Sequence, residues 1–290
     1  MEIIKYIGFT LLILVGSPII GGLLAGIDRK ISARMQRRKG PPILQPFYDV
    51  FKLLQKEATT VNFLTRFYVT YSLCFAAVAA VLFFLGMDIL LPIFALTLSV
   101  VFLIIAAYSS GSPYSLQGAQ RELLSIMAYE PMVFIAAFGF YSITHSFHVW
   151  SPLGMNSPIV VQLPLILLGF VYILSFKFRK SPFDLSTSHH GHQELVKGAT
   201  TEMTGICLAM FEVSHWFETV YALGFVFIFF IWNNPWSYVL GVAVCLVVYF
   251  LEILIDNSFA RVKWQAALKV TWAVSSIVGF VNLYIVQLWK

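Results

Sequence analysis

Long hydrophobic runs alternate with short polar segments along the whole chain. The runs are continuous rather than alternating residue by residue, which favours helices over strands. About 20 apolar residues cross a bilayer as a helix, and a backbone inside a bilayer must satisfy its own hydrogen bonds. The pattern therefore predicts one all-α polytopic membrane domain, 1–290, with about eight transmembrane helices at residues 3–27, 68–87, 89–109, 122–141, 158–177, 205–232, 236–255 and 264–288.

Two boundaries of this prediction depend on local signals. The first run is too long for the core of a signal peptide and is not followed by a clear cleavage site, so we expect a retained helix. The run from residue 68 to residue 109 is too long for a single span, and Gly86, Asp88 and Pro92 supply a turn that divides it.

Two polar segments are much longer than a turn, and they cover residues 28–67 and 178–204. Within the first, residues 43–56 follow a helical period. One face would carry Ile43, Phe47, Val50, Phe51 and Leu54, and the opposite face Asp49, Lys52 and Lys56. This pattern predicts an amphipathic helix that lies either on the membrane surface or against a protein partner.

The composition excludes a soluble domain and the charge distribution gives an orientation. Hydrophobic residues make up 59% of the chain and charged residues only 11%. Lys5 and Lys290 fall on one predicted side and Lys269 within the last span, which leaves sixteen of the 19 Lys and Arg residues on the other side. By the positive-inside rule both long loops are cytoplasmic and both termini lie outside. The net charge of +5 then reflects topology, not nucleic-acid binding.

Charged residues inside a bilayer are expensive and usually functional. Those within the predicted spans are nearly all acidic: Glu130, Glu212, Glu218 and Glu252. Lys269 is the lone base among them. Glu212 and His215 share a helical face, and Pro131 removes a backbone hydrogen bond next to Glu130. Two interpretations stay open, namely a proton relay and a set of ion pairs that hold the helices together.

The second long segment is rich in groups that can ionise or bind partners. It carries Asp184, His189, His190, His192, Glu194 and Glu202. The three histidines could suggest a metal, but one loop motif without a nearby cysteine does not define a tetrahedral ligand set. Contact with a protein partner, with proton exchange, is the preferred interpretation. Three cysteines within apolar runs do not predict a cluster held by this chain alone.

Several sequence blocks occur in a fixed order. The first loop contributes Asp28, Arg29, Gln36, Arg38, Gly40, Pro41, Gln45, Pro46, Asp49, Lys52 and Glu57. Later blocks contribute Arg121, Glu122, Tyr129, Glu130, Ser181, Pro182, Phe183, Asp184, Glu194, Leu195, Val196, Gly198, Glu202 and Gly205. These blocks resemble one family over nearly the whole chain. It is the membrane-subunit family that respiratory complex I shares with the energy-converting nickel–iron hydrogenases.

Three departures favour the hydrogenase branch, which includes the related formate hydrogenlyase membrane component. The quinone-reducing branch has an insertion after Gly-Pro, whereas Pro42 here leads directly to Ile43. The segment 186–193 is rich in histidine where that branch is rich in acids, and His215 stands where that branch tends to have Glu.

The resemblance implies that this chain docks a soluble redox module on a prokaryotic cell membrane and couples it to proton or sodium movement. The implied partners are a hydrogenase large subunit, an iron–sulfur small subunit, a ferredoxin-like subunit and an antiporter-like membrane subunit. Iron–sulfur clusters and a nickel–iron centre would lie on those partners, and this chain would bind no cofactor or metal itself.

The expected ion path combines family positions with the residue analysis: Glu130, Asp184, Glu194, Glu202, Glu212 and His215. The expected docking interface comprises Arg29, Arg34, Gln36, Arg38, Asp49, Arg121, His189, His190 and His192. Two alternatives remain at this point. One is the corresponding membrane subunit of a complex I-type NADH/quinone oxidoreductase, and the other is a stand-alone ion carrier.

Overall fold

A computed structural model describes residues 2–57, 62–186, 195 and 197–288. Within these residues the chain forms nine α-helices and three short 3-10 turns. The helices are α1 Glu2–Met35, α2 Gln45–Gln55, α3 Phe63–Phe84, α4 Leu90–Ser109, α5 Pro113–Thr144, α6 Pro164–Lys177, α7 Ile206–Ile228, α8 Trp236–Ser258 and α9 Trp264–Leu288. The 3-10 turns are η1 Ser151–Gly154, η2 Ile159–Val161 and η3 Gly198–Thr200.

Six of these helices are long and apolar enough to cross a membrane: α1, α3, α4, α5, α8 and α9. The predicted all-α membrane fold is therefore confirmed. Helix α6 is apolar but has only 14 residues, and α7 has 23 residues that include Glu212, His215 and Glu218. A total of eight spans, with α6 and α7 as the other two, stays a prediction.

The helix boundaries differ most at two places. Helix α1 continues to Met35, past the expected end at residue 27, and the Ser32 hydroxyl bonds the Asp28 carboxyl within it. Helix α5 begins at Pro113 instead of residue 122. Both extensions are polar, so a hydrophobicity criterion misses them although the backbone stays helical. The predicted division near Asp88 is confirmed, because α3 ends at Phe84 and α4 begins at Leu90.

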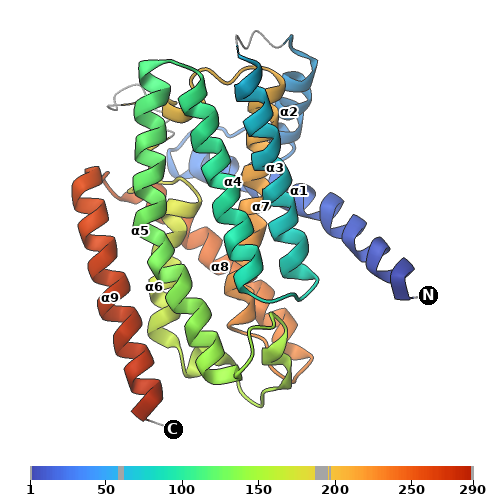
Figure 1. Ribbon diagram of the computed structural model, residues 1–290, viewed down its shortest axis with the longest axis vertical. Coiled ribbons are helices and arrows are strands. Elements are labelled where there is room, and N and C mark those ends of the chain that lie inside the picture. The colour runs from blue at the N-terminus through green and yellow to red at the C-terminus, as the bar shows by residue number, and fades with distance from the viewer. Residues whose placement is uncertain (1, 58–61, 187–194, 196, 289–290) are drawn as a thin grey trace.

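The helices form a bundle in which α3 packs against α4 and α7, and α4 packs against α5 (Figure 1). Helix α9 lies along α5 and α6 at one edge of the bundle. Helix α1 crosses obliquely at the other edge, and its N-terminal half projects away from the remaining helices (Figure 1). Aromatic rings fill the centre. The Phe225 ring stacks on that of Phe170, with ring centroids 4.5 Å apart, and meets the Phe140 ring edge to face at 5.9 Å.

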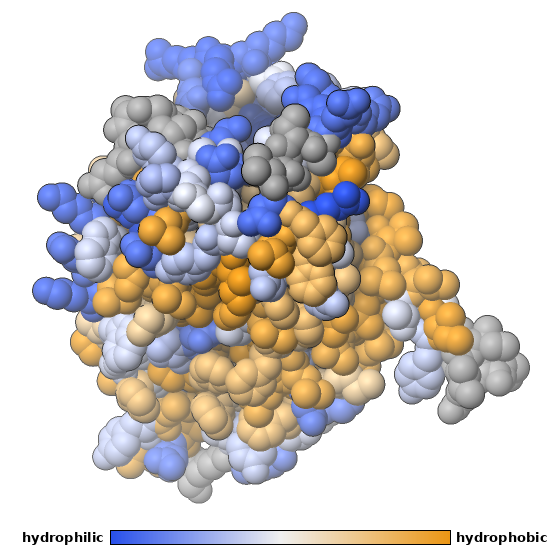
Figure 2. Space-filling model, turned by 45° about the horizontal axis from the view of Figure 1, so that its top comes forward, coloured by the Kyte–Doolittle hydropathy of each residue, from blue (hydrophilic) through white to orange (hydrophobic). Residues whose placement is uncertain are grey.

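Hydrophobic side chains also cover the outside of the bundle, as a lipid environment requires. Leu12 of α1, Phe94 of α4 and Phe280 of α9 are each more than half exposed. Hydrophilic residues gather at the end of the molecule that is uppermost in Figure 1, and Figure 2 shows them above a broad hydrophobic flank. We call this end the polar face.

Helix α2 lies at the polar face against α1 and α7. Pro46 and Val50 are buried, and the Phe47 ring lies 5.2 Å from that of Trp216. Phe51 and Leu54, which share the predicted apolar face, are 62% and 48% exposed. The buried stripe is therefore narrower than the sequence pattern predicts, and part of the apolar face of α2 points outward.

Helix α6 starts later than expected and depends on a distant side chain for its first turn. A 3-10 turn precedes it, and Pro164 is its first residue. The Asn282 side chain of α9 accepts hydrogen bonds from the backbone N–H groups of Leu165 and Ile166 at 2.9 and 3.0 Å. It therefore supplies the N-terminal cap that the α6 sequence lacks.

Candidate functional site

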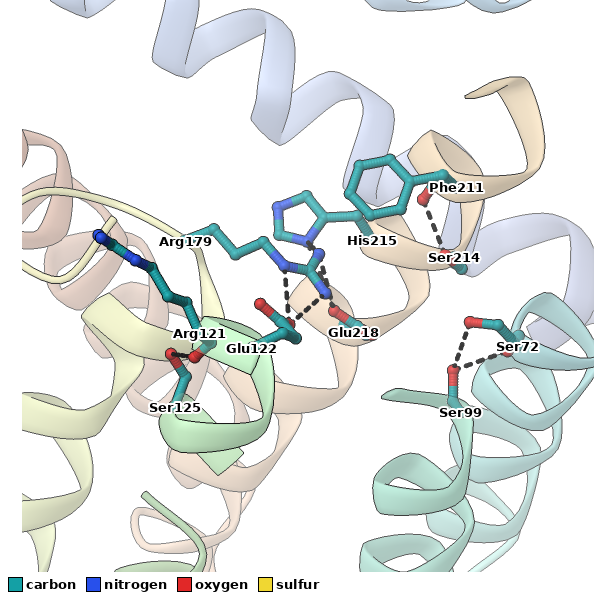
Figure 3. Close-up of polar contacts among 10 residues, drawn as sticks. All are labelled: Ser72, Ser99, Arg121, Glu122, Ser125, Arg179, Phe211, Ser214, His215 and Glu218. Atoms are coloured by element: carbon teal, nitrogen blue, oxygen red, sulfur yellow. Dashed lines mark hydrogen bonds and ion pairs between the residues drawn. The ribbon is translucent and has the colours of Figure 1, made fainter. Parts of the chain in front are cut away.

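The side chain of Arg179 joins three elements below the polar face. Helix α6 ends at Lys177, and Arg179 adopts a left-handed backbone conformation, with φ at 51°, that turns the chain back into the bundle. Its Nη2 lies 3.0 Å from Glu122 Oε1 of α5, and its Nη1 lies 3.5 Å from Glu218 Oε2 of α7 (Figure 3). His215 Nδ1 lies 3.2 Å from the same Nη1.

In this cluster of Glu122, Arg179, His215 and Glu218, the three permanently paired groups are nearly buried. The side chains of Arg179, Glu122 and Glu218 are 10%, 7% and 8% exposed. Burial opposes the charge of Arg179, but the two carboxyl groups outweigh it and raise the arginine pKa above its ordinary value. The cation is therefore fixed, and it cross-links α5 and α7 to the segment after α6.

A second set of charges lies beside the first, between that segment and helices α1 and α8. Lys180 Nζ pairs with Asp28 at 2.9 Å and lies over the Tyr249 ring. Asp184 Oδ2 pairs with Arg261 at 3.3 Å, while its Oδ1 is buried without a hydrogen-bond partner among the described residues. Burial raises the pKa of Asp184 to about 7 against the opposing effect of Arg261.

Two glutamates extend the charged region along the helices. Glu130 has one buried carboxyl oxygen that meets no hydrogen-bond partner among the described residues. Tyr129, its neighbour in α5, lies under Lys177 Nζ at 4.1 Å. Glu252 of α8 accepts a hydrogen bond from Ser175 at 2.8 Å, and its other oxygen is likewise unpartnered among the described residues. A buried carboxyl oxygen without a partner is costly when the group is charged, so such a group is expected either to be protonated or to bind water.

Three cavities lie in a row through this region. The largest, of about 440 Å³, opens between α1 and α8 and is lined by Gln36 and Arg38 among others. The second has a volume of about 240 Å³, and the third of about 120 Å³. Neighbouring cavities have lining residues in common, which are Asp28, Arg29, Asp256 and Arg261 for the first and second, and Phe178, Arg179 and His215 for the second and third.

Local sequence explains why the segment after α6 can lie so close to α5. Gly118 of α5 has no side chain, and a Cβ atom there would come within 2.1 Å of the Ala199 nitrogen. The turn η3 therefore packs directly on the α5 backbone. The Ser186 carbonyl accepts a hydrogen bond from the Ala199 N–H at 3.1 Å, which connects η3 to the residues that follow α6.

Comparison with known proteins identifies the family. A family model described as "NADH dehydrogenase" matches residues 7–287, almost the whole chain. The chain belongs to this family. Similar proteins of known name include hydrogenase-4 component C, formate hydrogenlyase subunit 4 and the subunit designated H of NADH-quinone oxidoreductase.

Three relatives match over most of their length. Hydrogenase-4 component C of Escherichia coli is 28% identical, with 86% of each chain covered. Formate hydrogenlyase subunit 4 of the same species is 26% identical, covering 88% of this chain and 90% of the relative. The NADH-quinone oxidoreductase relative of Neisseria meningitidis is 26% identical, covering 92% and 85%. Each is named as one component of a larger assembly.

One solved structure is similar over the complete fold. A chain of the membrane-bound sulfane sulfur reductase, described as an archaeal respiratory membrane complex, superposes with a TM-score of 0.88. Its identity is 25%, and the superposition covers 97% of this chain and 99% of that one. The resemblance that the sequence blocks predicted is thus confirmed at the level of this NADH dehydrogenase family.

The expected path residues are distributed unevenly. His215 and Glu212 line the third cavity, and Asp184 lines the second. Glu130 lies two helical turns along α5 from Glu122. Glu202 is exposed, next to η3, and does not join the buried clusters. Glu194 lies outside the described residues.

The expected docking residues that the structure describes lie at or near the polar face. Arg29 pairs with Asp49. Partial burial would raise the Asp49 pKa, but the hydrogen bonds from Arg29 and Gln45 and the Arg29 charge outweigh it and lower this pKa. Arg38 bonds Gln36 at 2.8 Å, and both line the first cavity. The other docking predictions are Arg34, which is exposed, Arg121, which is half-buried, and His189, His190 and His192, which lie outside the described residues.

The sequence analysis missed the centre of the cluster. Arg179 and Lys180 counted there only as positive loop charges, and Lys269 was expected to be the basic counterpart of the buried acids. The structure corrects this, because Lys269 is exposed on α9 while Arg179 and Lys180 pair with the acids. The sequence does contain a feature that could have identified Arg179 and Lys180 as partners of the acids, namely their position directly after an apolar helix. Among the described residues, no group of three or more His, Cys, Asp or Glu side chains could hold a metal ion.

Proposed function

We propose that this chain is the membrane-anchor and ion-coupling subunit of a membrane-bound energy-converting nickel–iron hydrogenase. In this proposal it links ferredoxin-dependent hydrogen evolution on soluble partner subunits to the movement of protons or sodium ions. The single observation that carries the coupling role is the row of cavities bordered by buried ionisable groups. It extends from the polar face, at Arg38, to the cluster around Arg179.

A static membrane anchor does not need such a row. Buried charges destabilise a fold unless they are paired, and apolar residues of similar size would serve an anchor equally well. Asp184, Glu130 and Glu252 each keep a buried oxygen without a partner among the described residues. Asp184 also titrates near neutral pH, since its pKa is about 7. Groups of this kind can take up and release protons under physiological conditions.

The polar face supports the docking role. Arg34, Gln36 and Arg38 are exposed there, and the first cavity opens beside them. A soluble module seated on this face would cover the mouth of the cavity row. Changes in charge on the module would then act on ionisable groups that are shielded from bulk water. Electrostatic interactions are stronger in such a shielded site than in water.

The choice of hydrogenase rests on the relatives and on the histidine-rich segment. Two of the three relatives reported above are named after a hydrogenase and a hydrogenlyase, and neither name refers to quinone. A second candidate follows from the solved structure, whose complex is a sulfane sulfur reductase. In both cases the iron–sulfur clusters and the catalytic centre would lie on partner subunits. A third candidate is the NADH-quinone branch.

The composition of the native complex tests this assignment. The tagged chain would be purified from membranes in mild detergent, and its partners identified by mass spectrometry and metal analysis. Stoichiometric nickel and a large subunit with two paired Cys-x-x-Cys motifs would support the hydrogenase. A nickel-free complex that reduces sulfane sulfur or quinone would replace it by one of the other candidates, and purification of the chain alone would contradict a coupling subunit.

A variant of Glu130 tests the coupling role itself. Replacing Glu130 by Gln keeps the shape of the side chain and removes its ability to ionise. In everted vesicles we expect ion pumping to fall, while hydrogen evolution with a soluble dye stays near the wild-type rate because the partner subunits are untouched. The matched control is Glu57→Gln at an exposed position. Undiminished pumping in Glu130→Gln vesicles would remove this residue from the path.

A further inference from the structure

The second and third cavities are separated by a wall that contains two basic side chains. Phe178, Arg179 and His215 are the residues common to both linings. Within the wall, His215 Nδ1 lies 3.2 Å from Arg179 Nη1 and 3.5 Å from Glu218 Oε2 (Figure 3). The imidazole is 24% exposed, whereas its charged neighbours are nearly buried. His215 is therefore the accessible member of the cluster.

The charges of the cluster do not balance when His215 is neutral. Glu122 and Glu218 contribute two negative charges against the one positive charge of Arg179, which keeps its proton at any physiological pH. One proton on His215 would bring the sum to zero. The electrostatic free energy of one uncompensated charge is larger in such a buried site than in water. Glu218 Oε2 is placed to accept a hydrogen bond from the protonated Nδ1.

The charges that surround the cluster leave this imbalance in place. Around the second cavity, three acids face three bases: Asp28, Asp184 and Asp256 with Arg29, Lys180 and Arg261. Around the third cavity, Glu212 faces Lys197. Each group is balanced in sign when its carboxyl groups are ionised. On the other side of the cluster, Lys177 at the end of α6 acts electrostatically on Glu218 and Glu122, and Glu130 acts on Lys177. This base and this acid also offset each other, so one excess negative charge remains.

We propose that His215 is a proton-loading site between the two cavities, and that Arg179 is the positioning residue that holds Glu122 and Glu218 around it. This inference rests on the proposed coupling function for its biological use. In the neutral form, Nδ1 accepts a hydrogen bond from Arg179 and the ring hydrogen is on Nε2. A proton that arrives at Nδ1 displaces this hydrogen bond and gives an imidazolium paired with Glu218. Loss of one proton from the ring restores the neutral form, so one proton enters for each that leaves.

The titration of His215 can be measured without any pumping assay. Diethyl pyrocarbonate modifies neutral imidazole and spares imidazolium, so the rate of His215 modification against pH, followed by peptide mass spectrometry in the purified complex, reports its protonation. Replacing Glu218 by Gln removes a negative neighbour and should move the midpoint to lower pH by at least about one unit. Replacing Arg179 by Gln removes a positive neighbour and should move it to higher pH by a similar amount. Arg179→Lys keeps the charge and should stay near the wild-type midpoint.

His145 provides an internal control, because it is exposed and should keep one midpoint in all variants. Opposite shifts from Glu218→Gln and Arg179→Gln, around a wild-type midpoint within the physiological pH range, would support the loading site, because His215 would then gain and lose its proton under the control of these two charges. If Arg179→Gln does not accumulate, Glu218→Gln decides alone. A His215 midpoint that is unchanged or raised in Glu218→Gln would overturn the inference. Shifted midpoints in a complex that does not pump would uphold the cluster and reject the proposed function.

Discussion

Asp184 gives a prediction whose sign and size follow from its surroundings. Its side chain is 7% exposed and meets Arg261 at 3.3 Å through one oxygen only. Burial raises the pKa of Asp184 from 3.8 to about 7, despite Arg261. This shift is about three pKa units, and each unit corresponds to about 1.4 kcal/mol. Ionisation of Asp184 in the folded protein is therefore disfavoured by at most about 4 kcal/mol.

The stability of the protein should therefore depend on pH in a defined direction. Because the folded-state pKa lies above the unfolded one, the contribution of Asp184 is complete below about pH 4 and is lost as the pH rises to about 7. Asp184→Asn cannot ionise and avoids this loss. We expect the variant to melt near the wild-type temperature at pH 4.5 and up to about 10 °C higher at pH 8, measured by thermal unfolding of the purified complex in detergent.

Asp49 provides a control of opposite sign. Its pKa is lowered, since the hydrogen bonds from Arg29 and Gln45 and the Arg29 charge outweigh the effect of burial. The contribution of Asp49 to the free energy of unfolding is present above the ordinary carboxyl pKa and disappears on acidification. Asp49→Asn should therefore destabilise the protein at neutral pH and have no effect on its stability in acid. If the difference between Asp184→Asn and wild type is the same at every pH, the buried environment assigned to Asp184 is wrong.

Two further predictions concern docking and stability. Arg38→Ala should weaken retention of the soluble module on salt-washed membranes about fivefold, the effect of about 1 kcal/mol expected for an exposed charge. Equal retention in Arg38→Ala and in Lys269→Ala, a change of the same charge away from the cavities, would contradict this. Asn282→Ala removes the α6 cap and leaves one buried and one partly buried N–H group unpaired, so it should cost about 2–4 kcal/mol in thermal unfolding. An exposed change on the same helix, Ser276→Ala, should have no effect, and an equally stable Asn282→Ala would refute the capping role.

Short-range signals were sufficient for most of the fold. Hydrophobic runs located the membrane helices because lipid imposes the same requirement on every residue of a span. The turn near Asp88 followed from Gly86 and Pro92, whose backbone preferences are local. The ordered blocks around Asp28, Asp184 and Gly205 gave the family for the same reason, since each block is contiguous in sequence.

The arrangement of the charges depended on the tertiary structure. Arg179, Glu122 and Glu218 are separated by 57 and 39 positions in the chain, and no periodic pattern relates them. The pairing follows from the left-handed turn after α6, from the missing side chain of Gly118, and from the packing of α7 between its neighbours. Asn282 caps α6 across more than a hundred residues for a similar reason. A sequence shows that a buried charge must be compensated, because an isolated one is too costly, but only the folded chain determines which partner compensates it.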